Sequence, residues 1–172
     1  MRWILALITI ITLLLAAVVV IGGLLSPGHE ASRAAELPAE PDAVFAIISA
    51  IEDSARWRPE VYEVRRLPGP TPAGPGGARY REVGVHGPVT VAIVEAAPPT
   101  RLVLAVSGAG PGFEGTWTFA LEPIPTGTRV TLTERGEIEN PVFRFLSRYL
   151  VGYTTSIDAY LAALTARLAQ GS

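Results

Sequence analysis

The sequence predicts an α+β fold, in which a curved antiparallel sheet surrounds a long C-terminal helix and one transmembrane helix comes first. Three observations support this prediction. The chain begins with a long uncharged apolar stretch, continues as short apolar segments between Gly- and Pro-rich turns, and ends with helical periodicity. Its 172 residues allow one ordinary domain and an appendage. We therefore expect a transmembrane helix at 1–25, a linker at 26–30 and one domain at 31–170.

The last stretch, residues 140–170, predicts one continuous helix. Asn140 is a suitable N-cap, and Pro141 suits the first helical position. Such a helix would be about 45 Å long and would need a wide apolar partner. Gly152 in its middle costs about 1 kcal/mol relative to alanine, and it either leaves room for a ligand or allows a bend. The apolar residues that recur at steps of three and four are Val142, Leu146, Tyr149, Leu150, Tyr153, Ile157, Leu161, Leu164 and Leu168.

The first stretch, Trp3 to Leu25, has no charge and as a helix would span about 34 Å, enough for a bilayer core of about 30 Å. A cleaved signal peptide is the rival interpretation. Its apolar core would be shorter, and His29-Glu30-Ala31 is a poor cleavage site, so the sequence favours an uncleaved anchor. Arg2 favours a cytoplasmic N-terminus, which places the domain on the extracytoplasmic side of the membrane.

The domain's elements follow in order. Residues 31–37 predict a strand, Pro41 begins a short helix, and a second short helix covers about 52–57. The turns between later segments are short, so an antiparallel meander is expected. A Pro- and Gly-rich stretch at 68–77 predicts a mobile loop, and a second Gly-rich loop covers 108–112. The six predicted strands after the helices are 60–67, 78–83, 89–96, 101–107, 113–122 and 129–138.

Composition excludes several kinds of site. The chain has no cysteine, so disulfides and thiolate chemistry are excluded. The net charge is −2 with no basic cluster, which predicts no binding of nucleic acid. His29 beside the anchor and His86 in a glycine-flanked turn match no metal motif, and we predict neither a metal nor another cofactor. No serine elbow accompanies His86, which we interpret as an exposed turn residue.

Carboxylates on the strands leave two interpretations open. Glu95 continues the face of Ile93 at period two, Glu134 continues the face of Leu132, and Glu82 shares a face with Tyr80. If these faces line a cavity, the carboxylates lie inside it or at its edge and need an arginine partner. The other interpretation is that the strand ends twist out to solvent and carry ordinary charges.

The element order resembles the START-like helix-grip fold of the SRPBCC superfamily, often described as polyketide cyclase/dehydrase and lipid transport. The resemblance covers about 31–170. It rests on the stretch 37–48 (LPAEPDAVFAII), on Trp57-Arg58-Pro59, on the strands 115–123 and 127–138, and on the helix from Asn140. It implies an apolar cavity between helix and sheet, of the kind that in this superfamily holds lipids, sterols, quinones, polyketides or plant hormones. Some members are enzymes.

The sequence therefore favours a membrane-anchored domain that binds a hydrophobic small molecule such as a lipid, isoprenoid or polyketide-like compound. An enzyme of the cyclase/dehydrase type with Tyr or Glu acid–base groups is the first alternative, and a closed-core module for a partner protein is the second. We predict no catalytic residue, and the ligand and the lipid bilayer are the expected partners. The candidate cavity residues are Trp57, Tyr80, Ile93, Trp117, Phe119, Leu132, Tyr149, Gly152 and Tyr153.

Overall fold

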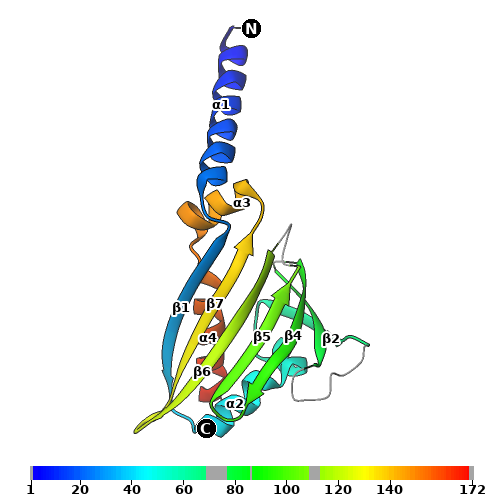
Figure 1. Ribbon diagram of the computed structural model, residues 1–172, viewed down its shortest axis with the longest axis vertical. Coiled ribbons are helices and arrows are strands. Elements are labelled where there is room, and N and C mark those ends of the chain that lie inside the picture. The colour runs from blue at the N-terminus through cyan, green and yellow to red at the C-terminus, as the bar shows by residue number, and fades with distance from the viewer. Residues whose placement is uncertain (1, 69–76, 86, 109–112, 171–172) are drawn as a thin grey trace.

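The structure is a computed structural model that describes residues 2–68, 77–85, 87–108 and 113–170. His86 and most of the two predicted loops at 68–77 and 108–112 lie outside the described residues. Within the described part, the fold class is the one that the sequence predicts. A seven-stranded antiparallel sheet surrounds a C-terminal helix, two short helices follow the first strand, and an apolar helix comes first (Figure 1).

The sheet has the order β1-β7-β6-β5-β4-β3-β2. From β2 to β7 each strand pairs with its neighbour in the sequence, and β1 pairs with β7 at one edge. Side chains of β7 alternate between the core and the outside, as the apolar periodicity predicts. The strands are β1 (Gly28–Leu37), β2 (Val61–Arg66), β3 (Arg79–Gly84), β4 (Gly87–Ala97), β5 (Arg101–Ser107), β6 (Phe113–Ile124) and β7 (Gly127–Ile138).

Two details of the sheet differ from the sequence prediction. β1 begins at Gly28, three residues before the predicted strand, so His29 and Glu30 belong to the sheet. β4 has a register shift between Ile93 and Glu95. A bulge places an extra residue in one strand, so Glu95 loses the face that period two assigns to it.

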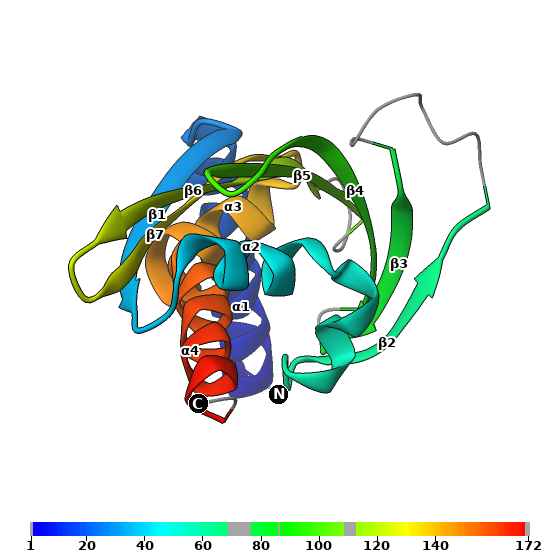
Figure 2. The same ribbon diagram turned by 90° about the horizontal axis from the view of Figure 1, so that it is seen from below.

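The helices pack on the concave side of the sheet. α2 (Pro41–Ser49) and the 3₁₀ helix η1 (Ile51–Arg56) lie across the open side, and Figure 2 shows the sheet bent around α4 (Thr155–Ala169). Ile157, Leu161 and Leu164 of α4 are buried against the sheet. This apolar face is the part of the predicted C-terminal helix that the sheet holds.

The C-terminal helix is interrupted, whereas the sequence predicts a continuous one. α3 (Pro141–Leu146) runs into a π-helical turn, η2 (Ser147–Val151), and the chain then breaks at Gly152 before α4. Gly152 has φ +85 and ψ 145, a conformation that only glycine adopts readily. The sequence allows Gly152 either to leave room for a ligand or to bend the helix, and in the structure it bends the chain.

α1 (Arg2–Leu24) extends away from the domain (Figure 1) and is long and apolar enough to cross a membrane. Its last turn packs against α3. A Cβ on Gly22 would collide with the backbone oxygen of Pro141, so the two backbones approach as closely as glycine allows. Arg144 of α3 donates from Nη1 to the backbone oxygen of Leu25 at 2.8 Å. The helix therefore has a fixed direction relative to the domain.

Candidate functional site

The inner face of the sheet, which faces α4, is the candidate site. The strand register places Ala31, Glu134, Trp117, Leu104 and Ile93 side by side across five strands of this face. All except the glutamate are apolar or aromatic. This row therefore combines apolar and aromatic side chains with one carboxylate, on the second of its five strands.

A buried polar pair lies at the end of this face nearest α1. Nε2 of His29 is 3.1 Å from Oε1 of Glu134, and the two side chains are only 5% and 8% exposed. An ionised carboxylate only accepts hydrogen bonds, so the hydrogen bond requires the His29 tautomer with the proton on Nε2. The ring of Tyr153 stacks on His29 with 4.6 Å between centroids. Oε2 of Glu134 is buried and has no hydrogen-bond partner among the described residues.

Two glycines leave this end of the inner face without side chains. Gly136 lies opposite His29 in the register, and Gly115 lies opposite Gly136 on the next strand. Val106 is the next residue in the same row. A small-residue patch thus adjoins the carboxylate whose second oxygen has no hydrogen-bond partner in the described part of the chain.

Tyr160 of α4 is the centre of an aromatic cluster deeper in the domain. Its ring centroid lies 5.3 Å from that of Trp57, 5.5 Å from Trp117 and 5.2 Å from Phe119. Burial raises the pKa of Tyr160 well above its ordinary value, so the phenol stays protonated into the alkaline range. The indole Nε1 of Trp57 is buried and makes no hydrogen bond to the described residues.

An ion cluster adjoins the aromatic cluster. Arg58 lies over the Tyr160 ring, 4.9 Å from its centroid, and pairs with Glu60 at 2.8 Å and Glu82 at 3.0 Å. Burial alone would lower the pKa of Arg58, but the two carboxylates outweigh it and the pKa is raised. Glu82 is thus inside the domain and paired with an arginine, which is one of the two interpretations left open for it.

The nine candidate cavity residues predicted from the sequence differ in burial. Most of them lie in the core or pack against it. Tyr149 and Gly152 are exposed on the chain segment before α4, because the break at Gly152 turns that segment away from the sheet. The buried candidates are Tyr80, Phe119 and Leu132, and the half-buried ones are Trp57, Ile93, Trp117 and Tyr153.

The two carboxylates Glu134 and Glu95 lie on different faces of the sheet, and His29 lies in a strand where the sequence predicts a linker. Glu134 is buried at the site, but Glu95 is half-exposed and pairs with Arg101 at 3.1 Å on the outside. The sequence assigns His29 to the linker, whereas the structure places it in β1, paired with Glu134. The available signal was that His29 continues the alternation of Ala31, Ala35 and Leu37 in β1.

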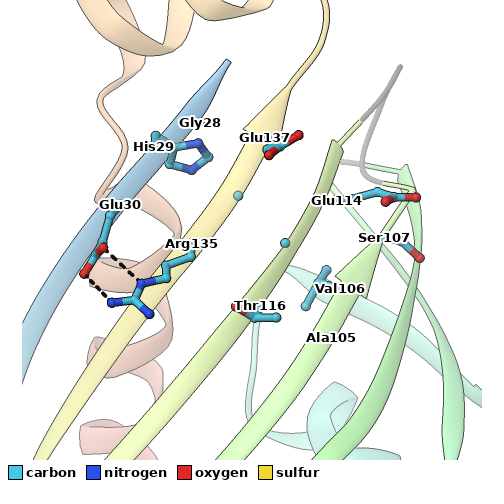
Figure 3. Close-up of a pocket in the computed structure, with 12 residues that line it drawn as sticks. Gly28, His29, Glu30, Ala105, Val106, Ser107, Glu114, Thr116, Arg135 and Glu137 are labelled. Carbon is cyan, nitrogen blue, oxygen red and sulfur yellow. Dashed lines mark hydrogen bonds and ion pairs between the residues drawn. The ribbon is translucent and has the colours of Figure 1, made fainter. Parts of the chain in front are cut away.

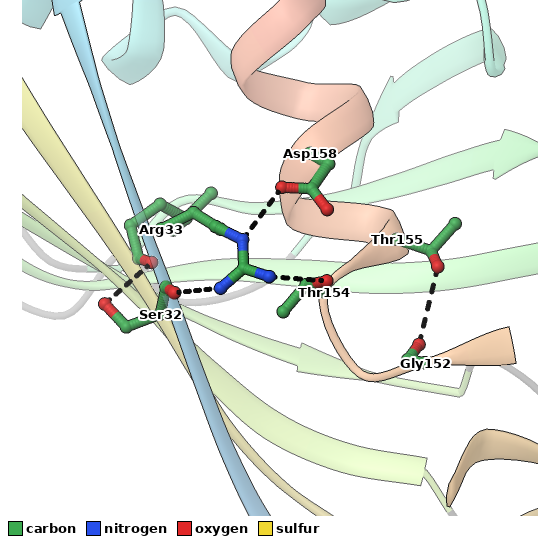
Figure 4. A network of polar contacts seen from close by, with 7 residues as sticks. Ser32, Arg33, Gly152, Thr154, Thr155 and Asp158 are labelled. Atoms are coloured by element: carbon green, nitrogen blue, oxygen red, sulfur yellow. Dashed lines mark hydrogen bonds and ion pairs between the residues drawn. The ribbon is translucent and has the colours of Figure 1, made fainter. Parts of the chain in front are cut away.

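The polar link between β1 and α4 holds the helix just after its break (Figure 4). Nε of Arg33 lies 3.4 Å from Asp158, and Nη2 donates to Thr154 at 3.4 Å. Both charged side chains are half-exposed, so solvent screens the pair and its contribution to stability is small. The link orients the start of α4 next to Tyr153.

A second concavity lies on the opposite, outer face of the sheet. Figure 3 shows Glu30, Arg135 and Thr116 on this face, with Glu30 and Arg135 joined by two hydrogen bonds of 3.0 and 3.2 Å. The groove has a volume of about 910 Å³ and is open to solvent. Glu114 and Glu137 lie directly opposite each other in it. Its lining combines these charged side chains with glycines and small side chains of the same strands, and the described residues include no cluster that could hold a metal ion.

Comparison with known proteins agrees with this architecture. Residues 28–169 match the protein family described as polyketide cyclase / dehydrase and lipid transport. No curated protein matches the sequence of this chain.

Several solved structures share the fold at low sequence identity. The Zhui aromatase/cyclase from Streptomyces sp. R1128 is 14% identical with a TM-score of 0.68, over 83% of this chain and 94% of that one. A START superfamily protein from Mycobacterium smegmatis is 18% identical with a TM-score of 0.65, over 84% and 99%. A protein from Thermus thermophilus is 24% identical with a TM-score of 0.63, over 85% and 99%. At these identities the likeness concerns the fold alone.

Proposed function

Because the chain belongs to the polyketide cyclase / dehydrase and lipid transport family, we propose that it binds a hydrophobic small molecule between the inner face and α4. The observation that carries the proposal is the composition of this face. Apolar and aromatic side chains form its wall, and two buried polar atoms, Oε2 of Glu134 and Nε1 of Trp57, have no hydrogen-bond partner among the described residues. A buried polar atom without a partner costs about 1–3 kcal/mol, which a ligand's polar groups would recover.

These two atoms define the chemistry of the ligand. A carboxylate oxygen accepts, so the end of the ligand near Glu134 should carry a hydroxyl or an amine. The indole nitrogen donates, so a carbonyl or ether oxygen would suit the end near Trp57. The body between them is apolar, and its burial contributes about 25 cal/mol per Å² before ordering costs. A lipid or isoprenoid with a polar head fits this description.

The membrane is the source or destination of the ligand in this proposal. α1 is the anchor, and the His29–Glu134 end of the site lies on the side of the domain from which α1 leaves. Arg2 favours a cytoplasmic N-terminus, so the domain belongs on the extracytoplasmic side. A site at this position takes up a molecule from the adjacent bilayer leaflet or delivers it there.

An enzyme of the aromatase/cyclase type is the second candidate. One observation favours it: Glu134 and His29 are buried and hydrogen-bonded to each other, which is the arrangement of a general acid–base pair. Tyr160, held protonated by burial, would act through its neutral hydroxyl and not as a base. A closed module for a partner protein is the third candidate and requires an inner face packed without a ligand.

The test is native mass spectrometry of the full chain extracted in detergent, followed by identification of any bound molecule. We expect a bound apolar compound with a hydroxyl or amine. Val106→Trp fills the small-residue patch beside Gly115, so this variant should lose the bound compound. Ala105→Trp changes the neighbouring residue on the outer face, so this variant should retain the compound. A wild-type chain without any bound molecule would contradict the proposal, and a chemically altered molecule would favour the enzyme.

A further inference from the structure

The segment between β7 and the break at Gly152 has a surface that the site does not use. Pro141 and Arg144 of α3 hold this segment against the last turn of α1. Nη2 of Arg144 also donates to the backbone oxygen of Glu139 at 2.8 Å, so the arginine links the residue that follows α1 to the chain just before α3. The segment 141–150 is therefore fixed beside the C-terminal end of α1.

This segment exposes large apolar side chains. Leu150 is 72% exposed and Tyr149 57%, and Val142 and Phe143 are exposed as well. Among the described residues outside α1 and this segment, the exposed large apolar side chains are Tyr62, Val85 and Val94. Single exposed apolar residues are ordinary, but a group of them on two consecutive short helices marks an interaction surface.

The length of α1 determines what this surface meets. A helix of 23 residues is about 34 Å long, slightly more than a bilayer core of about 30 Å. Gly22 is two residues from the end of α1, so its contact with Pro141 lies at the boundary between acyl chains and headgroups. Tyrosine is enriched at that depth, and the exposed Arg148 can extend its guanidinium to lipid phosphates.

We propose that α3 and η2 lie in the interfacial layer of the bilayer, with Phe143, Tyr149 and Leu150 in contact with lipid, as a second membrane contact beside α1. The inference rests on the part of the proposed function in which α1 spans the membrane. The partner is the lipid bilayer itself, because the surface continues directly from the anchor. Two contacts at different points fix the tilt of the domain, and they keep the His29–Glu134 end of the site against the membrane.

The experiment uses the absence of cysteine, because any introduced cysteine is the single labelling site. Full chains with Leu150→Cys, Val94→Cys or Leu14→Cys are spin-labelled and reconstituted into vesicles of phosphatidylcholine and phosphatidylglycerol. The accessibility of each label to oxygen, which concentrates in lipid, is compared with its accessibility to a water-soluble nickel chelate. Val94 is the matched control, because it is an exposed apolar residue of β4, 57% exposed.

We expect the labels at Leu150 and Leu14 to favour oxygen and the label at Val94 to favour nickel. Phe143→Cys gives an independent second reading on α3. Labels at Leu150 and Phe143 that resemble the one at Val94, while Leu14 is in lipid, would overturn the second contact and leave the anchor intact. A Leu14 label that favours nickel would overturn the anchor and the second contact together.

Discussion

Glu134 joins the last strand of the sheet to the first, because its Oε1 lies 3.1 Å from Nε2 of His29 while its Oε2 is buried without a hydrogen-bond partner among the described residues. One oxygen thus has a structural role, and we propose that the other binds the polar group of a ligand. The two roles can be separated experimentally, because different substitutions affect them.

The structural role of the His29–Glu134 hydrogen bond predicts that His29→Phe lowers the stability of the fold. Phenylalanine keeps the stack on Tyr153 but removes the hydrogen bond to Glu134, which leaves a second buried oxygen without a donor. The free energy of unfolding should fall by about 1–3 kcal/mol, measured by denaturant titration of the full chain in detergent. Glu95→Gln on the exposed outside is the control and should change it by less than about 0.5 kcal/mol. Equal stability of the two variants would contradict the assigned role of the pair.

The ligand role predicts a chemical preference. The wild-type chain should bind a fluorescent long-chain alcohol about tenfold more tightly than its methyl ether, because only the alcohol donates to Glu134. Glu134→Gln replaces the charged acceptor by an amide and should remove most of this preference. Fluorescence titration measures both affinities, and Glu95→Gln again serves as control. The carboxylate is not the polar contact if the preference survives in Glu134→Gln.

The burial of Tyr160 predicts a loss of stability at alkaline pH. Its pKa is raised on folding, so the folded state binds the phenolic proton more tightly than the unfolded chain does. The resulting stability is fully present below the unfolded pKa of about 10 and is lost as pH rises above it, by at most about 1.4 kcal/mol per pH unit. Tyr160→Phe should reduce this alkaline loss.

The measurement is the free energy of unfolding between neutral pH and pH values above 10. Tyr80, whose pKa is also raised by burial and by Glu52, keeps its own share of the effect in the Tyr160→Phe variant. Identical alkaline profiles for wild type and variant would show that the Tyr160 proton does not contribute.

The backbone at Gly152 predicts an unusual substitution pattern. A Cβ there would meet only the Thr155 hydroxyl at 3.9 Å, so space is available and the cost arises from φ +85 with ψ 145. Gly152→Ala should therefore destabilise the chain by about 1–3 kcal/mol in denaturant titrations. Asparagine relieves strain in the left-handed helical region, but ψ 145 lies outside that region, so Gly152→Asn should cost as much. A harmless Gly152→Ala would mean that the helix closes over the break.

The N-terminal charge predicts the orientation. Arg2 precedes α1, so the domain should be digested by protease added to intact cells whose outer layer is permeabilised. A control protein of the cytoplasm must stay intact in the same sample. If the domain is digested only after the membrane itself is broken, the orientation is the reverse.

The sequence predicted most of the fold because hydrophobic periodicity and turn residues carry most of the information about the elements. Strands β6 and β7 alternate clearly, and the Asn140-Pro141 start of α3 is a strong local signal. The sequence does not predict the break at Gly152, because a glycine in the middle of a helix is compatible both with a bend and with room for a ligand. Helical periodicity therefore makes Tyr149 a cavity candidate, whereas the break leaves it exposed before α4.

The site was harder to predict for two physical reasons. A bulge in β4 reversed the face of Glu95, and nothing local in the sequence marks the bulge. His29 was separated from the domain by a linker that is in fact the start of β1. In contrast, Trp57, Trp117 and Phe119 pack in or against the core, because large aromatic residues beside an apolar face are usually buried, and their contact with a ligand stays a prediction.

The pairing of β1 with β7 also affects when the domain can form during synthesis. Residues 28–37 of β1 pair with residues 128–137 of β7, so the first strand to leave the ribosome waits for the last one. Contacts so distant in sequence form late and slowly. A nascent chain arrested before Thr128 should leave β1 sensitive to protease at the membrane, and one extended past Ile138 should protect it.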